Sequence, residues 1–122
     1  MKTIAIPLFG SRVSPRFDCA QNFMLVTIKN GEMEKGDTIA LVQTNPLEKI
    51  NTLIRLGVDV IICGGVSKFY EQLLEGEGVQ LISGVRGEVN DILAQFMSGK
   101  SIGKDTNLTQ VDNRKRMDLN GA

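Results

Sequence analysis

The sequence predicts an α/β fold in which helices flank a mixed five-stranded sheet, with the element order βββαβαβα. Three observations support this class. The first strand-like run is almost wholly apolar, an Asn-Gly pair separates the next two runs, and the second half alternates apolar strands with amphipathic helices. The chain has 122 residues, which suits one domain.

Three strands are expected before the first helix. Residues 3–8 form an apolar run that fits a strand buried on both faces, and an irregular polar loop follows over 9–22. Residues 23–29 and 34–43 are expected to pair around Asn30-Gly31, because both turn residues tolerate positive φ. The first half therefore predicts one buried strand and one hairpin.

The first helix is predicted from its end signals. Asn45 can cap it, Pro46 suits the first helical position, and Glu48 stands where a capping-box carboxylate would reach back. Gly57 can end the helix in a left-handed turn. The expected apolar stripe comprises Leu47, Ile50, Leu53 and Ile54.

Two strand–helix units complete the predicted fold: strands over 59–63 and 79–82, and helices over 67–75 and 88–98. The residues expected to face inward from these helices are Tyr70, Leu73, Leu74, Val89, Ile92, Leu93, Phe96 and Met97. Right-handed crossovers would place strands 3–8, 59–63 and 79–82 parallel and adjacent, with the hairpin on the outer side.

Composition excludes several classes of function. The chain carries 14 Lys and Arg against 14 Asp and Glu, so it lacks the basic excess of a nucleic-acid-binding protein. It has no histidine, which excludes imidazole catalysis and imidazole metal ligands. No run of residues is long and apolar enough to cross a bilayer, and the first ten residues lack a signal-peptide pattern. We expect a cytoplasmic protein without membrane or nucleic-acid partners.

Composition also changes near residue 100. Residues 100–122 carry five Lys and Arg, three Asp and only isolated apolar side chains. Such a segment buries little apolar surface. We therefore expect one folded domain over 1–99 and a flexible polar tail over 100–122.

The candidate site lies where three segments should meet at the carboxyl edge of the parallel strands: residues 9–22, 63–67 and 83–87. Two of them lead through glycines into helix N-termini, which attract anions. Guanidinium groups add forked donors for anionic ligands. The candidate residues of this anion pocket are Arg12, Ser14, Arg16, Cys19, Gly64, Gly65, Arg86 and Gly87.

Two cysteines are candidate metal ligands. Cys19 lies in the polar loop after the first strand, and Cys63 ends a strand that is expected to neighbour that first strand. Their thiolates could therefore offer soft contacts to iron or copper. Plainer interpretations remain open: Cys63 as an inert buried thiol, Gly64-Gly65 as a tight turn, and the loop arginines as solvated residues.

No catalytic constellation is present. The strand order is similar to the ribonuclease H-like fold, in which a two-metal nuclease needs carboxylates on its first and fourth strands. Here the first strand has no acid and the fourth ends in Cys63. Phosphate-binding GxxxxGK[ST] and GxGxxG motifs are also absent. We expect a protein that is not an enzyme.

Several segments together resemble the dinitrogenase iron–molybdenum cofactor biosynthesis family over about residues 2–99. They are MKTIAIP, SRVSPRFDCAQNFMLV, VDVIICGGV and GVQLI…GEVNDILAQFMSG. The most distinctive positions are Val13, Ser14, Phe17, Ala20 and Phe23. Cys19 stands at a position that is commonly basic in this family. The resemblance implies a small ribonuclease H-like protein that binds or carries a metal–sulfur cluster.

The family includes an orange-protein subgroup, which holds a molybdenum–copper sulfide cluster without covalent protein ligands. From this resemblance we expect a non-catalytic carrier for an anionic cluster of molybdenum with iron or copper, held largely non-covalently. Its partners would be proteins that donate or accept the cluster. The alternative is a regulatory or protein-interaction module that keeps the fold without a cluster.

Overall fold

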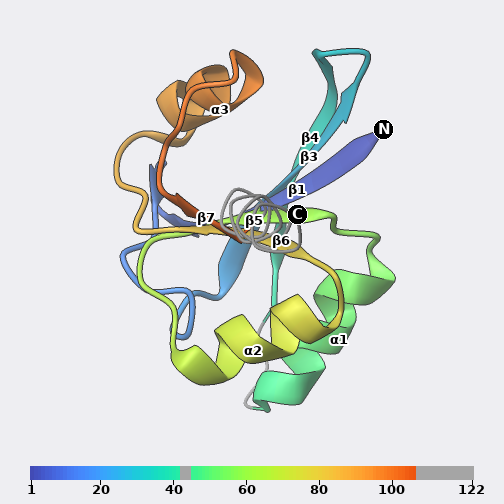
Figure 1. Cartoon of the computed structure of the whole chain (residues 1–122), viewed down its shortest axis with the longest axis vertical. Helices are drawn as coiled ribbons and strands as arrows, with labels where there is room; N and C mark the ends of the chain where they lie inside the picture. Colours follow the sequence, from blue (N-terminus) through green and yellow to red (C-terminus); the bar gives the residue numbers. More distant parts are fainter. Residues whose placement is uncertain (42–44, 107–122) are drawn as a thin grey trace, which may run out of the picture.

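The structure, a computed structural model, describes residues 1–41 and 45–106 (Figure 1). These residues form a seven-stranded sheet in the order β4-β3-β1-β5-β6-β7, with β2 paired to β1. The strands are β1 (Lys2–Phe9), β2 (Arg12–Val13), β3 (Asn22–Lys29), β4 (Glu32–Ala40), β5 (Val60–Ile62), β6 (Gln80–Ser83) and β7 (Lys104–Asp105). The helices are α1 (Pro46–Arg55), α2 (Lys68–Gly76) and α3 (Val89–Met97). The α/β class and the predicted order of the major elements are confirmed.

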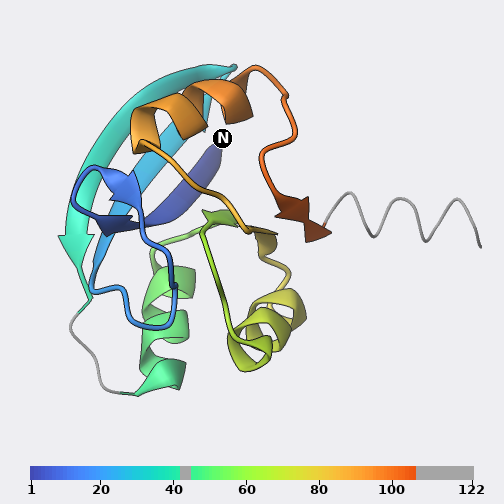
Figure 2. The ribbon, with the colours of Figure 1, turned by 90° about the vertical axis from the view of Figure 1, so that its left-hand side faces the viewer.

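The sheet lies between two helical layers, with α1 and α2 on one face and α3 on the other (Figures 1 and 2). Each face has its own apolar core. The α1–α2 side is built around Ala5, Phe17, Phe23, Leu53, Ile61 and Leu74. The α3 side is built around Ile4, Ile6, Val26, Ile62, Val89 and Ile92. Within the described residues, the helices are too short or too polar to span a bilayer.

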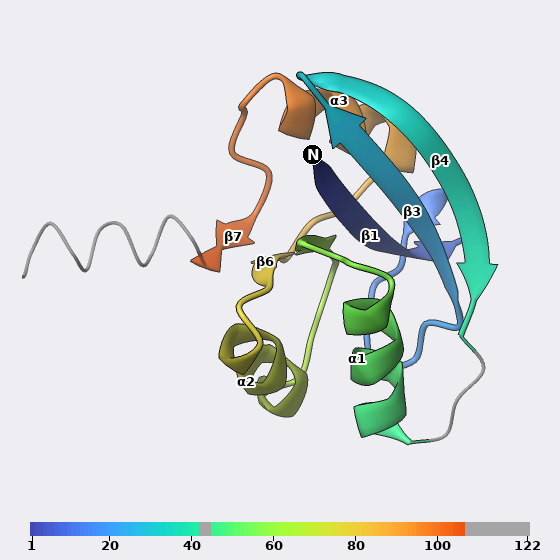
Figure 3. The same cartoon turned by 90° about the vertical axis from the view of Figure 1, so that its right-hand side faces the viewer.

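Strand β1 is central to the sheet. It pairs parallel with β5 and antiparallel with β3, and β5 in turn pairs parallel with β6. The β3–β4 hairpin lies on the outer side, as Figure 3 shows. Its turn has positive φ at Asn30 (55°) and Gly31 (78°), as the Asn-Gly signal predicts.

The structure corrects the expected end of the folded domain. Strand β7 pairs with β6 beyond residue 99, and Ile102 packs against the α3-side core. The backbone at Gly103 approaches β6 so closely that a Cβ there would meet the Ser83 carbonyl oxygen. Isolated apolar residues in a polar segment gave no strand signal, and β7 forms because β6 offers it an unpaired edge. Residues 107–122 of the expected tail lie outside the described residues.

Helix α1 confirms its predicted cap but not its entire apolar stripe. Asn45 accepts a hydrogen bond from the Leu47 amide at 2.9 Å, and Pro46 opens the helix. Leu47 itself is 49% exposed, whereas Lys49 is only 4% exposed. Lys49 can face inward because its ammonium donates to three backbone carbonyl oxygens of the loop before β3.

The loop after β1 is fastened to the sheet edge by backbone hydrogen bonds. The Val13 amide donates to the Gly87 carbonyl at 2.9 Å, and the Phe17 amide donates to the Gly65 carbonyl at 2.8 Å. In return, the Gly65 amide donates to the Pro15 carbonyl at 2.7 Å. These bonds bring the loop beside both the β5–α2 and the β6–α3 connections.

Gly64 permits this close approach. A Cβ on Gly64 would lie 2.6 Å from the Ser14 carbonyl oxygen and 2.8 Å from that of Pro15. These are backbone atoms, which cannot rotate away as a flexible side chain could. Glycine at this position therefore serves the packing of the loop against the sheet edge.

We predict that Gly64→Ala lowers the free energy of unfolding by about 1–3 kcal/mol, because the new methyl group must push the loop away. Urea denaturation would measure the change. Gly76→Ala is the matched control: nothing lies within 4 Å of a Cβ there, so that variant should be as stable as the parent or more stable. Equal stability of the two variants would contradict the close-packing role of Gly64.

Cys63 lies in the core beside β5. It is 0% exposed, and burial, together with the nearby carboxylates of Asp18 and Glu71, raises its pKa to about 12. At pH 8 the thiolate fraction of such a group is on the order of one in ten thousand.

Alkylation should therefore distinguish the two thiols. We predict that iodoacetamide at pH 8 modifies Cys19, which is exposed, and leaves Cys63 unmodified until the chain is unfolded. Intact-mass measurement would count one adduct on the native protein and two on the denatured protein. A native Cys19→Ser variant that still gained an adduct would contradict the assignment.

Candidate anion pocket

The three predicted segments meet in a pocket of about 640 Å³, which we call the edge pocket. The loop after β1 (blue), the segment after β5 (light green) and the segment after β6 (gold) gather there, at the left of Figure 1. The lining residues are Phe9, Arg12, Val13, Pro15, Gly64, Gly65, Gly84, Val85, Arg86 and Gly87. Chain segments up to 78 residues apart in the sequence thus form one concave surface.

Arg86 and Arg12 give the edge pocket its positive charge. The exposed side chain of Arg86 makes no hydrogen bond or ion pair with any other described residue. Arg12 pairs with Glu88 at 3.4 Å, and the Glu88 carboxylate also accepts a hydrogen bond from the Ser11 hydroxyl at 2.7 Å. Among the described residues, the Arg86 guanidinium is therefore unpaired, and the Arg12 guanidinium lies beside the Glu88 carboxylate.

A second, smaller pocket of about 370 Å³ lies on the other side of Phe9 and Pro15, which line both. We call it the loop pocket. Its lining residues are Leu8, Phe9, Ser14, Pro15, Arg16, Cys19, Ala20, Gln21 and Asn22. The predicted site residues therefore divide into two groups, with Arg16 and Cys19 in the loop pocket rather than the edge pocket.

Ser14 has a structural role in this arrangement. Only 6% of it is exposed, and its hydroxyl donates to the Arg16 carbonyl oxygen at 3.1 Å while accepting from the Arg16 amide at 3.4 Å. The hydroxyl thus closes a local turn and fixes the backbone between the two pockets.

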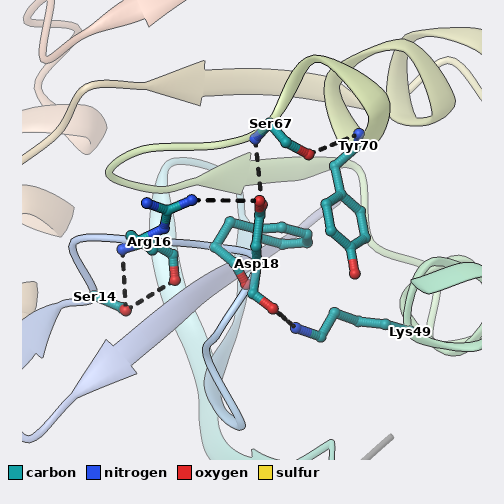
Figure 4. A network of polar contacts seen from close by, with 7 residues as sticks. Ser14, Arg16, Asp18, Lys49, Ser67 and Tyr70 are labelled. Atoms are coloured by element: carbon teal, nitrogen blue, oxygen red, sulfur yellow. Dashed lines mark hydrogen bonds and ion pairs between the residues drawn. The ribbon is translucent and has the colours of Figure 1, made fainter. Parts of the chain in front are cut away.

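The N-terminus of α2 already has partners within the protein for two of its amides. The Ser67 amide donates to Asp18 Oδ1 at 3.2 Å, and the Ser67 hydroxyl accepts from the Tyr70 amide at 3.4 Å (Figure 4). Asp18 also lies 3.9 Å from the Arg16 guanidinium. The protein's own Asp18 thus already places a negative charge at this helix terminus, where we expected a bound anion to lie.

The two cysteines occupy different environments. Cys19 is exposed in the loop pocket, whereas Cys63 is buried in the core with a raised pKa. A protonated, inaccessible thiol is a poor metal ligand. The structure thus favours the interpretation of Cys63 as a structural thiol. Among the described residues, no three His, Cys, Asp or Glu side chains come together as a metal-ligand set.

Sequence reasoning missed three residues that organise this region: Asp18, Lys49 and Glu88. Lys49 alone left a usable signal, because it precedes the buried Leu53 by four residues and so shares its helix face. Asp18 and Glu88 reach partners 49 and 77 residues away in the sequence. Local patterns carry no information about such contacts.

Comparison with known proteins identifies the family of this chain. The family model for the dinitrogenase iron–molybdenum cofactor matches residues 1–99. The protein MJ0580 of Methanocaldococcus jannaschii is 24% identical over 102 residues, which cover 80% of this chain and 86% of that protein.

Solved structures share the fold. The crystal structure of PH0822 matches with a TM-score of 0.77 and 20% identity, over 84% of this chain and 96% of that one. The apo form of the orange protein from Desulfovibrio gigas matches with a TM-score of 0.69 and 21% identity, over 85% and 93%. Since the family model covers nearly all of the described chain, this protein belongs to the dinitrogenase iron–molybdenum cofactor family.

Proposed function

We propose that this protein is a non-catalytic carrier that holds an anionic metal–sulfur cluster in the edge pocket. The observation that carries the proposal is the meeting of Arg12 and Arg86 with the glycines of the β5–α2 and β6–α3 connections in one concave surface. Its ligand would be a sulfide cluster of molybdenum with iron or copper. Proteins that make or use the cluster would be its partners.

The donors of the edge pocket suit such a ligand. Guanidinium groups stabilise negative charge through charge-assisted hydrogen bonds and need no covalent bond to metal. They are the main donors here, because the Gly65, Gly84 and Val85 amides already bond carbonyl oxygens within the protein. At Gly84 nothing lies within 4 Å of the position of a Cβ, which leaves room for a ligand to approach the backbone there. The volume of about 640 Å³ lies within the usual range for small-ligand sites.

The carboxylate of Glu88 does not close the pocket to anions. The Arg12 and Glu88 side chains are 58% and 45% exposed, and their atoms are 3.4 Å apart. Ion pairs this exposed typically contribute about 0–1 kcal/mol. A multiply charged cluster can therefore compete with Glu88 for Arg12, while Arg86 needs no such exchange.

Cys19 offers a second kind of contact. It is exposed in the loop pocket, which Phe9 and Pro15 separate from Arg12 and Arg86 in the edge pocket. A cluster in the edge pocket would reach Cys19 only by extending past these two residues. We assign Cys19 an auxiliary role, and we assign Cys63 none.

A second candidate, a regulatory or interaction module without a cluster, is favoured by the internal pairs. Glu88 pairs with Arg12, and Asp18 pairs with Arg16 while capping α2. These pairs let the fold satisfy part of its own positive charge. The two candidates differ in one measurable property, the metal content of the protein purified anaerobically from its own cells.

We predict that the anaerobically purified protein carries molybdenum together with iron or copper, and that the apo protein takes up tetrathiomolybdate. Arg12→Ala combined with Arg86→Ala should reduce molybdenum per chain after desalting by at least about tenfold, because both guanidinium donors are lost. Elemental analysis would measure the metal.

The matched control is Arg55→Ala, on an exposed surface of α1 outside both pockets. It should bind as the parent does. Equal retention in the double variant and the control would contradict the edge-pocket proposal, and a metal-free parent that also rejects tetrathiomolybdate would support the interaction module.

A further inference from the structure

The side chain of Lys49 reaches from α1 into the loop before β3, which borders the site. It projects from α1 and is 4% exposed. Its Nζ donates to the carbonyl oxygens of Phe17 at 3.2 Å, Asp18 at 3.2 Å and Ala20 at 3.0 Å (Figure 4 shows part of this network). All three acceptors belong to one short turn, so a single ammonium uses its three protons on that turn.

Aromatic rings surround the same ammonium. Nζ lies 5.3 Å from the ring centroid of Phe17, 5.7 Å from that of Phe23 and 5.8 Å from that of Tyr70. These distances suit cation–π attraction. Burial lowers the pKa of Lys49, while the nearby Asp18 and Cys19 oppose that shift. The position thus combines a desolvated cation with hydrogen-bond and ring partners that compensate its burial.

The geometry of the peptide bond extends the effect of Lys49 to the outer face of the turn. In a trans peptide the N–H points opposite to the preceding C=O. Because the carbonyls of Phe17, Asp18 and Ala20 point inward to Nζ, the amides of Asp18, Cys19 and Gln21 point outward. None of these three amides bonds another described residue.

The turn also connects the two pockets to α2. The Phe17 amide bonds Gly65 at the edge pocket, and the Asp18 carboxylate caps the Ser67 amide. Cys19 lies exposed on the same turn. A change in the position of this turn would therefore alter the loop pocket, the cap of α2 and one wall of the edge pocket together.

We propose that Lys49 is a positioning residue for cluster binding: its buried ammonium fixes the Phe17–Ala20 turn and thereby the arrangement of both pockets. The cluster-binding part of this inference rests on the proposed function. The positioning itself does not, because it concerns contacts within the protein alone.

The test compares Lys49→Met, which keeps an unbranched apolar chain but removes the donors, with Leu53→Ala on the same helix. Leu53 is 1% exposed and belongs to the same core, so its truncation destabilises that core while leaving the Lys49 ammonium in place. NMR measures the hydrogen-exchange rate of each amide, and each rate is divided by the rate of the Ile61 amide in β5. Lys49→Met should accelerate exchange at the Ala20 and Ser67 amides at least about tenfold.

In Leu53→Ala the same amides should stay within about threefold of their parental ratio to Ile61, because general destabilisation affects all of them together. Lys49→Arg, which retains a cationic donor, should recover most of the protection. Parental ratios in Lys49→Met would overturn the proposal, and so would equal acceleration in both variants.

Tetrathiomolybdate uptake distinguishes the proposed cluster binding from the positioning role of Lys49. Lys49→Met should hold less than half of the molybdenum that Leu53→Ala holds. If the parent itself takes up none while the exchange pattern appears as expected, the proposed function fails and the positioning role stands. If Lys49→Met does not fold, amide exchange is measured in the parent protein instead. Amides that point outward should exchange faster at Asp18, Cys19 and Gln21 than the bonded amides of Phe17 and Ala20. The reverse order would overturn the proposal.

Discussion

The close contact between the loop after β1 and the Gly64–Gly65 turn is the constraint on which the site depends. Backbone meets backbone there: the Phe17 and Gly65 amides bond the Gly65 and Pro15 carbonyls at 2.8 and 2.7 Å. A side chain at position 64 would separate the two segments. Together with the bond from the Val13 amide to the Gly87 carbonyl, this contact brings the loop and both connections into one common pocket.

Charge in this region is distributed unevenly. Two ion pairs contribute little to stability: Arg12 with Glu88 is exposed to solvent, and Arg16 with Asp18 is 3.9 Å long with an exposed guanidinium. The buried Lys49 is different, since a desolvated ammonium without its acceptors would cost several kcal/mol. Strong internal contacts therefore set the shape of the loop, and weak ones leave its outward arginines open to exchange with a ligand.

Local signals in the sequence predicted most of the fold. Asn30-Gly31, the Asn45-Pro46 cap and the apolar runs each act over a few residues, and each appears in the structure as expected. The convergence of three segments at the carboxyl edge also followed, because it is a property of parallel strands and not of individual side chains. The five expected strands are present, and β2 and β7 are short additions.

The distribution of charge within the site could not be predicted in the same way. Whether a guanidinium is paired depends on contacts such as Ser11 with Glu88, which join residues 77 apart in the sequence. The inward side chain of Lys49 likewise depends on carbonyl oxygens about 30 residues earlier in the chain. Such contacts are known only once the fold is known.

Whether the edge pocket binds an anionic sulfide cluster can be measured by NMR titration of the isotope-labelled apo protein with tetrathiomolybdate under anaerobic conditions. A ligand bound in the edge pocket should cause saturable shifts of the amides at residues 64–65 and 84–87, with smaller shifts on the β3–β4 hairpin. Shifts confined to surfaces outside the edge pocket, or none at millimolar ligand, would contradict binding in the edge pocket.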